Sequence, residues 1–207
     1  MTSATRLDVN AEVAAICAAL EARRDPAYEQ GMRRTVPSQQ PAHATRVPDI
    51  RKTASAWRKA HRDVVVDETF ALCDALWATG WREERLVAID LVRASKATRE
   101  AVDWQRLAGW SRDIDNWELV DQLTDVTGRL LVLDWSLLRS TRALESSENP
   151  WQRRLGLVTL IVAFMKGGVL REELTAMTER LAKDSHPLVR RAVVWAPDRL
   201  RKDHLDG

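Results

Sequence analysis

Apolar residues recur at spacings of three and four along most of the chain, and the alternation typical of half-buried strands is absent from the sequence. Spacings of three and four place apolar side chains on one face of an α-helix. Capping and helix-breaking residues separate these segments, as at Gly80, Asn149-Pro150 and Ser185-His186-Pro187. The sequence therefore predicts an all-α protein with helices near residues 10–24, 48–61, 66–79, 81–95, 98–110, 117–132, 135–144, 151–166, 170–183 and 187–196.

The predicted helices also repeat. The segment NPWQRRLGLV (149–158) aligns with HPLVRRAVVW (186–195) at an offset of 37 residues, with the proline and both arginines in register. Asp121 and Arg85 fall at the matching place in two earlier helices, so the series 85, 121, 154, 191 advances in steps of 36, 33 and 37. Such a period with two helices per unit indicates stacked HEAT-like pairs, in which one helix position recurs along one surface. We expect a HEAT-like repeat α-solenoid with a concave, positively lined face.

Two segments lack the helical pattern. Residues 1–8 are expected to form a disordered N-terminus. Residues 33–48, RRTVPSQQPAHATRVP, are rich in Pro, Gln and Thr and have no periodicity, which predicts a mobile loop. We expect residues 9–207 to form a single HEAT-like repeat domain that includes this loop.

The charge balance leaves the partner open. The 32 Lys and Arg residues nearly cancel the 30 Asp and Glu residues, giving a net charge of +2, and clustering matters more than this sum for attraction to a polyanion. Cys17 and Cys73 stand far apart without metal or redox spacing, which favours reduced cytoplasmic thiols. No signal peptide and no apolar run of membrane-spanning length are present in the sequence. We expect a soluble protein with no membrane partner.

Metal and cofactor chemistry is not expected. The four histidines have no metal-ligand spacing, and the sequence contains neither HExxH nor the glycine motifs that bind phosphates or dinucleotides. The GxSxG motif of hydrolases is absent as well. The residues left for chemistry are a carboxylate, aromatic faces and arginines, so we expect no metal and no cofactor.

The stretch DNWELVDQL (115–123) places an indole beside a carboxylate. Trp117 and Asp121 lie about 40° apart around the helix axis. They are opposite the apolar stripe formed by Leu119, Val120, Leu123, Val126 and Leu130. One interpretation is that Trp117 packs on a neighbouring helix while Asp121 is a solvated carboxylate. The other is a functional site, and we favour it because packing alone gives no reason for an indole and a carboxylate to share the polar face.

Pairs of adjacent arginines recur in the first turn of two predicted helices: Arg153, Arg154, Arg190 and Arg191. A cation in this position opposes the helix dipole, at a cost of about 0.3–1 kcal/mol when exposed. A bound phosphate would reverse this penalty, because free N–H groups and guanidinium groups both bind phosphate. The alternative is that each arginine pairs with a nearby acid such as Glu148 or Asp184.

Trp195 allows two interpretations. Its helix direction falls near Leu188 and Arg191, which favours ordinary core packing. It also lies in the last turn before Pro197, where side chains often reach a surface. The pattern alone leaves both open, whereas Trp57, Trp77, Trp104 and Trp135 are more simply interpreted as packing between helices.

The chain resembles the DNA alkylation repair family, the HEAT-like (AlkD-like) alkylpurine DNA glycosylases. The resemblance follows VPDIRK (47–52), LWATGWREERLVAIDLV (76–92), NWELVD (116–121) and the two repeated segments at 149–158 and 186–195. The chain departs from these relatives in ending soon after Trp195, where they usually continue with further helix. It also lacks the aromatic-rich pattern common in the region of 33–48.

The resemblance implies roles for individual residues. Trp117 and Trp195 match active-site tryptophans, Asp121 matches the catalytic aspartate, and Arg154 matches an arginine that contacts a DNA phosphate. Together with the repeated arginines, the candidate DNA-binding residues are Arg154, Arg153, Arg190, Arg191 and Arg85.

The implied activity is hydrolysis of the N-glycosidic bond of cationic N3- and N7-alkylpurines, such as 3-methyladenine and 7-methylguanine, in double-stranded DNA. Ordinary glycoside hydrolysis uses two carboxyl groups, but a cationic purine leaves as a neutral base, so Asp121 alone would suffice. We expect a monomer in the cytoplasm, on the nucleoid when bound to DNA. The alternatives are a non-catalytic DNA-structure binder on the same scaffold, with activity lost through the short C-terminus, and a protein-interaction scaffold.

Overall fold

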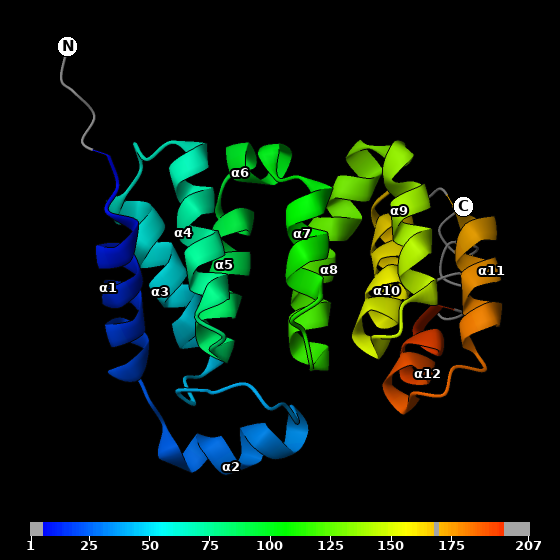
Figure 1. Cartoon of the computed structure of the whole chain (residues 1–207), viewed down its shortest axis with the longest axis horizontal. Helices are drawn as coiled ribbons and strands as arrows, with labels where there is room; N and C mark the ends of the chain where they lie inside the picture. Colours follow the sequence, from blue (N-terminus) through cyan, green and yellow to red (C-terminus); the bar gives the residue numbers. More distant parts are fainter. Residues whose placement is uncertain (1–5, 168–169, 197–207) are drawn as a thin grey trace. The chain divides into compact units, whose positions relative to one another are not determined.

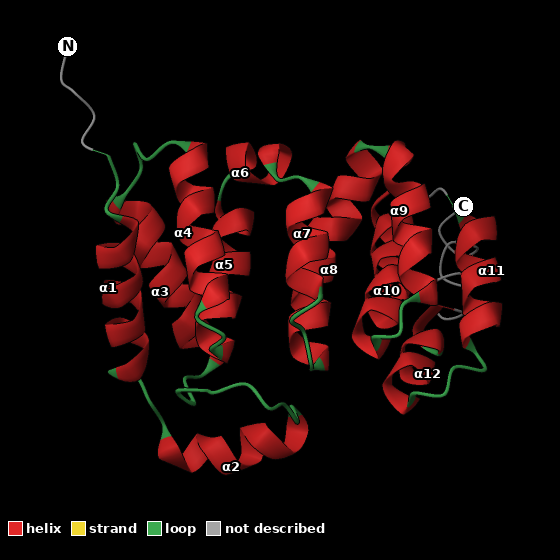
Figure 2. Ribbon diagram, in the orientation of Figure 1, coloured by secondary structure: helices red, strands yellow, loops and turns green. Residues whose placement is uncertain are grey.

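The computed structural model describes residues 6–167 and 170–196. All the regular elements in this part of the chain are helical (Figure 2). The prediction of an all-α, HEAT-like helical repeat is confirmed. Residues 1–5 of the predicted disordered N-terminus lie outside the described residues. The elements are α1 (Val9–Glu21), α2 (Pro26–Thr35), α3 (Val47–Ala60), α4 (Val66–Ala78), α5 (Arg82–Ala94), α6 (Lys96–Ala101), α7 (Trp104–Ser111), α8 (Trp117–Leu133), the 3-10 turn η1 (Trp135–Leu137), α9 (Leu138–Ala143), the 3-10 turn η2 (Leu144–Ser146), α10 (Pro150–Gly167), α11 (Arg171–Leu181) and α12 (Pro187–Val193).

The chain forms two compact units, residues 1–102 and 103–207. In the first unit, α5 packs against α1, α3, α4 and α6. Gly80, with a φ of 80°, makes the turn from α4 into α5, a left-handed conformation that glycine adopts without steric cost. Apolar side chains with no exposed surface fill this core, among them Leu20, Ile50, Leu72 and Ile89.

One helix of the first unit was not expected. Asp25 accepts a hydrogen bond from the Tyr28 backbone N–H and Pro26 occupies the first turn, so α2 begins with a regular N-cap. In Figure 1, α2 lies below the lower ends of α3 and α5, roughly at right angles to them. The apolar pattern did not predict it, because Met32 is its one buried residue.

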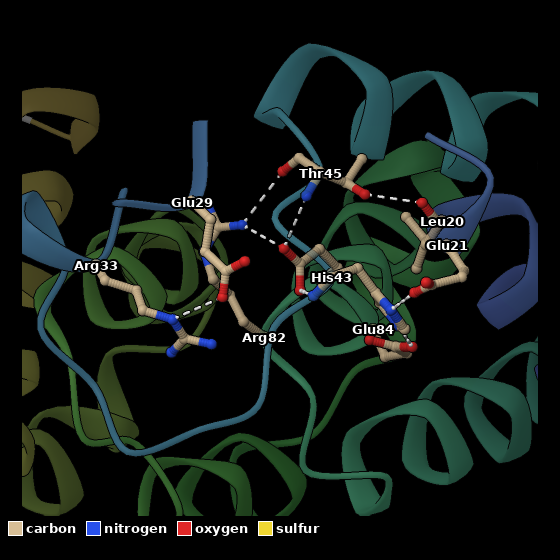
Figure 3. A network of polar contacts seen from close by, with 9 residues as sticks. Leu20, Glu21, Glu29, Arg33, His43, Thr45, Arg82 and Glu84 are labelled. Carbon is tan, nitrogen blue, oxygen red and sulfur yellow. Dashed lines mark hydrogen bonds and ion pairs between the residues drawn. The ribbon is translucent and has the colours of Figure 1, made fainter. Parts of the chain in front are cut away.

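A buried polar network holds the segment between α2 and α3, which lies inside the stretch 33–48 that we expected to be mobile (Figure 3). Glu83 accepts hydrogen bonds from the backbone N–H groups of His43 (3.0 Å) and Thr45 (3.2 Å) and from the Arg82 guanidinium (2.9 Å). The His43 ring lies between carboxylate oxygens of Glu21 (2.6 Å) and Glu84 (2.7 Å). The segment is therefore tied to α5 by charge-assisted hydrogen bonds to the buried carboxylates of Glu83 and Glu84.

The network also shifts the pKa values of His43 and Cys17. Burial opposes charging of His43, but the hydrogen bonds from its ring to Glu84 and Glu21 prevail and raise its pKa. Burial and the neighbouring Glu84 carboxylate raise the pKa of the Cys17 thiol to about 12. Neither Cys17 nor Cys73 forms a disulfide.

The helix predicted over 98–110 is broken in two. Val102 is extended, and Asp103 then caps α7 by accepting a hydrogen bond from the Arg106 backbone N–H. Asp is among the preferred N-cap residues because its side chain satisfies a backbone N–H that the helix leaves free. The break at Asp103 coincides with the boundary between the two units.

The second unit contains the predicted repeat. Its successive helix pairs are α7 with α8, the segment α9–η2 with α10, and α11 with α12, and α10 packs against both α8 and α12 (Figure 1). Asp121, Arg154 and Arg191 are each the fifth residue of α8, α10 and α12. The repeat read from the sequence therefore corresponds to equal positions in α8, α10 and α12, the second helix of each of these pairs.

Two contacts fix α8 against α10. The Thr127 and Thr159 hydroxyl groups share a buried hydrogen bond of 2.7 Å. A Cβ atom at Gly128 would lie 2.5 Å from the Val162 side chain, so only glycine permits this approach of the two helices. The hydrogen bond and the close approach set the register that brings the first turns of α8 and α10 together.

No helix in the described residues is long and apolar enough to cross a membrane.

Candidate active site

The first turn of α8 places Trp117 and Asp121. Asn116, which has no exposed surface, caps the helix by accepting a hydrogen bond from the Leu119 backbone N–H at 3.0 Å. Behind the cap, Leu119, Val120 and Leu123 are buried as predicted. Trp117 and Asp121 lie on the opposite, partly exposed side of the helix, so the buried stripe orients the pair toward α10 and α12.

Arg154 of α10 binds the Asp121 carboxylate. Its Nε and Nη2 atoms donate to Oδ1 at 3.1 Å and 2.9 Å, and Nη2 also donates to Oδ2 at 3.0 Å. Its Nη1 atom donates to the Leu188 carbonyl oxygen of α12 at 2.6 Å. Arg154 is 2% exposed, whereas the Asp121 side chain keeps 22% of its exposure. The buried guanidinium thus connects α8, α10 and α12. The carboxylate that it binds remains partly exposed to solvent.

Trp195 completes the arrangement. Its ring lies 4.7 Å from the Arg154 guanidinium carbon, in cation–π geometry. Trp195 itself is 40% exposed, so one of the two interpretations left open by the sequence, a side chain at the surface, fits the structure. These residues surround a cavity of about 270 Å³ lined by Trp117, Asp121, Arg154, Leu188, Arg191 and Trp195.

Burial and the ion pair act in opposite directions on Asp121. Burial raises the pKa of the Asp121 carboxyl above its ordinary value, and the Arg154 charge and hydrogen bonds offset part of this rise. A carboxylate that is partly withdrawn from water interacts more strongly with a nearby cation, because fewer water molecules screen it. The site therefore contains a carboxyl group whose remaining open side faces a cavity with aromatic walls.

The two arginines that precede Arg154 and Arg191 in the chain bind protein groups. Arg153 pairs with Asp184 at 2.6 Å and 2.9 Å and donates to the carbonyl oxygens of Ser147 and Glu148. Arg190 donates to the carbonyl oxygens of Asp184 and Ser185. Asp184 was one of the two acids that the sequence suggested as arginine partners.

Arg85 and Arg191 have contrasting surroundings. Arg85 belongs to the first unit, is 7% exposed, and lies over the Trp77 ring at 5.0 Å with its Nε donating to the Trp77 carbonyl oxygen. Arg191 is exposed at the rim of the Asp121 cavity and makes no ion pair within residues 6–167 and 170–196. The DNA contacts predicted for all five candidate arginines stay predictions. Of the five, Arg154 and Arg191 line the cavity.

The sequence pattern did not predict the Asp121–Arg154 pair or the use of the Leu188 carbonyl. Both depend on the register between helices, which no single-helix pattern contains. The spacing of the repeat was the available signal, because equal positions in consecutive helices of a stacked array lie side by side.

Comparison with protein families identifies the chain. A model of the DNA alkylation repair enzyme family matches residues 16–204. The chain belongs to the DNA alkylation repair enzyme family. A comparison with curated proteins gave no match.

Membership of the DNA alkylation repair enzyme family gives the chain a role in the repair of alkylated DNA and makes DNA its partner. The match includes every residue of the Asp121 cavity, since they all fall within 16–204. Within the described residues, no group of three or more His, Cys, Asp or Glu side chains is arranged to hold a metal ion.

Proposed function

We propose that this protein is a DNA glycosylase that hydrolyses the N-glycosidic bond of cationic N3- and N7-alkylpurines in double-stranded DNA. The observation that supports it is the single cavity that joins Asp121, Trp117 and Trp195. A partly buried carboxylate between two indoles suits a cationic ligand, since indole faces attract cations by about 0.5–2 kcal/mol per contact and the carboxylate attracts them directly.

In the proposed reaction the bond between C1′ of the deoxyribose and the alkylated purine breaks, and the purine leaves with the bonding electrons as a neutral base. The sugar becomes an oxocarbenium ion, which the Asp121 carboxylate stabilises by charge. Water then adds to C1′, directed by Asp121, and releases a proton to solvent. No group has to protonate the leaving base, because the alkyl group has already made it cationic.

Arg154 has a positioning role in this proposal. Its bonds to both oxygens of Asp121 hold the carboxylate in one orientation, and its bond to Leu188 anchors that orientation to α12. In this arrangement the guanidinium is buried and bound to protein groups, so we assign the DNA phosphate contact at the cavity to the exposed Arg191. Trp117 and Trp195 would lie against the alkylated nucleotide.

The open walls of the cavity suit a base that stays in the duplex. Trp195 is 40% exposed, and the Asp121 side chain keeps 22% of its exposure. Most glycosylases extrude the target nucleotide into an enclosing pocket. In the proposed reaction, Asp121 and the exposed tryptophan instead reach C1′ and one face of the damaged nucleotide.

The test is base release from a duplex containing 7-methylguanine under single-turnover conditions. The parent protein should convert the lesion to an abasic site, and Asp121→Asn should be slower by about 10² to 10³, the effect of removing one electrostatic stabiliser of a transition state. Because the change keeps the side-chain volume but leaves the buried Arg154 without its carboxylate, circular dichroism establishes the folded fraction and the rates are compared per folded molecule.

A matched control is Asp125→Asn, one turn further along α8, where the carboxylate pairs with Arg129 and Lys166 outside the cavity. It should release the base at the parent rate. If Asp121→Asn releases base as fast as Asp125→Asn, the assignment of Asp121 is wrong. Tight duplex binding by a parent protein that releases no base would instead favour the non-catalytic DNA binder.

A further inference from the structure

Half of the residues that line the Asp121 cavity belong to α12 or follow it directly. They are Leu188, Arg191 and Trp195, three of the six lining residues. The helix has seven residues, about two turns, and a helix this short is marginal without support from the rest of the fold. Its N-cap residue, His186, forms no side-chain cap hydrogen bond. The shape of the cavity therefore depends on what holds the start of α12.

An ion pair holds the start of α12 to α10. The Arg153 guanidinium of α10 binds both oxygens of the Asp184 carboxylate, Nε to Oδ2 at 2.6 Å and Nη2 to Oδ1 at 2.9 Å. The same Oδ1 atom accepts a hydrogen bond from the His186 backbone N–H at 2.8 Å. Asp184 thus binds the residue at which α12 begins, and Arg153 binds Asp184. We call the pair Arg153 and Asp184 the clasp.

The clasp is fixed on its α10 side as well. The third nitrogen of the Arg153 guanidinium, Nη1, donates to the carbonyl oxygens of Ser147 at 2.8 Å and Glu148 at 3.0 Å. The Arg153 side chain keeps 15% of its exposure and the Asp184 side chain 5%. A bidentate pair with this little contact with water is more directional than an exposed ion pair. The clasp therefore restricts how α12 lies against α10.

Arg154 connects the clasp to the carboxylate of the cavity. It follows the clasp arginine directly in α10 and donates to the Leu188 carbonyl oxygen at 2.6 Å. Its other two nitrogens bind the oxygens of Asp121. Leu188 comes two residues after His186, so a shift at the start of α12 removes this acceptor from Arg154 and opens the wall around Asp121.

We propose that Arg153 and Asp184 are positioning residues for the Asp121 cavity, which they assemble by holding α12 against α10. For its effect on rate, the proposal rests on the proposed release of bases at Asp121. Neither clasp residue lines the cavity, so the contribution passes through Arg154 and α12. A displacement of about 1 Å caused by a change far from the reacting atoms can slow a reaction by about 10²-fold.

The first test measures the titration of the Asp121 carboxyl in the free protein by carbon-13 NMR, in the variant Arg153→Gln. Loss of the clasp releases α12 and admits water to the cavity. Because burial is the main cause of the raised pKa of Asp121, this pKa should fall toward its ordinary value. The matched control is Arg180→Gln, which removes a pair of the same bidentate geometry, with Glu145 at 2.6 Å and 2.9 Å. Arg180 does not line the cavity, and its variant should keep the parent pKa.

The variant Asp184→Asn separates the clasp from a direct effect of charge. It removes a negative charge, whereas Arg153→Gln removes a positive one, so direct effects of charge on the pKa of Asp121 have opposite signs. Disruption of the clasp should instead lower this pKa in both variants. The double variant Arg153→Gln, Asp184→Asn leaves no unpaired charge at the clasp, and it supplies the measurement if a single variant does not fold. Any result other than a fall in the clasp variants with no change in Arg180→Gln contradicts the proposal.

The second test measures single-turnover base release from a 7-methylguanine duplex, per folded molecule. Each single clasp variant should be slower than the parent by about 10-fold to 10²-fold, and Arg180→Gln should keep the parent rate. The double variant should be no slower than the single variants, because each change removes the same contact. Equal rates in the clasp variants and the control, or additive losses in the double variant, would overturn the proposal. If the parent releases no base, the proposed function fails, and the titration alone decides whether the clasp positions Asp121.

Discussion

One cluster of charged side chains in each unit contains a carboxylate paired with a buried arginine, and the two clusters differ in what surrounds that carboxylate. In the first unit, Glu83 is fully buried, and both of its oxygens accept hydrogen bonds from backbone N–H groups or Arg82. In the second unit, Arg154 binds Asp121 from one side only, and the other side opens to a cavity with tryptophan walls. A saturated buried carboxylate fixes a loop, whereas a carboxylate held from one side remains available to a ligand.

The largest effect on stability is expected from Glu83→Gln. The amide nitrogen would face a backbone N–H, and Arg82 would keep its charge without a compensating carboxylate. Breaking a buried ion pair from one side costs about 3–5 kcal/mol, which denaturant unfolding would measure. The exposed Glu172→Gln is the control and should change the free energy of unfolding by less than about 0.5 kcal/mol.

The same Glu83→Gln variant tests whether the Glu83 network takes part in base release. Base release per folded molecule should equal that of the parent, since Glu83 belongs to the loop network and not to the Asp121 cavity. A variant that kept its stability but lost base release would assign the Glu83 network to the reaction. The contrast between a structural Glu83 and a catalytic Asp121 would then be wrong.

A smaller effect is expected from Trp117→Ala. Loss of one cation–π and packing contact should raise the barrier for cationic lesions by about 1–2 kcal/mol, or about ten-fold in rate. The control is Trp135→Ala, a tryptophan of the same unit that is 39% exposed and does not line the cavity. Single-turnover rates at saturating enzyme give the comparison, and equal losses in both variants would count against a contact between Trp117 and the lesion.

The smallest effect concerns pH. Because burial raises the pKa of Asp121 above its ordinary value, base release should decline on acidification at a higher pH than it would for an ordinary aspartate. Arg154→Gln removes the charge that opposes this rise, so the acid limb of its pH–rate profile should shift to still higher pH. Spontaneous release from free DNA is subtracted at each pH. An unshifted limb would mean that Asp121 does not limit the reaction in acid.

The contribution of Asp121 to the free energy of unfolding changes with pH in the opposite direction to base release. A carboxyl group whose pKa is raised in the folded state stabilises the fold below its unfolded pKa, and this contribution is lost as pH rises through the folded value. Ionised Asp121 therefore lowers stability in the pH range where the proposed reaction needs it. Asp184 has the opposite sign, because the hydrogen bonds from Arg153 lower its pKa, so its contribution is present above the unfolded pKa and is lost on acidification.

Several elements could be predicted from the sequence because they depend on local spacing. The buried stripe of α8 and the exposed placement of Trp117 and Asp121 follow from helix geometry, and the repeat placed Asp121, Arg154 and Arg191 at equivalent positions. The α2 helix was missed because it buries almost nothing, although Asp25-Pro26 is a recognisable helix start. The pairing of Arg154 with Asp121 was not predictable, because it is set by the Thr127–Thr159 contact and the close approach at Gly128.

The most direct test compares lesions that differ in charge. The proposed site contains one carboxylate and no group assigned to protonate the leaving base, so the rate should depend on how cationic the lesion is. In duplexes of one sequence, 3-methyladenine and 7-methylguanine should be released. The neutral lesion 1,N6-ethenoadenine should be slower by about 10² or more, the contribution that general acid catalysis usually supplies. Equal rates on neutral and cationic lesions would reveal a general acid and contradict the mechanism based on Asp121 alone.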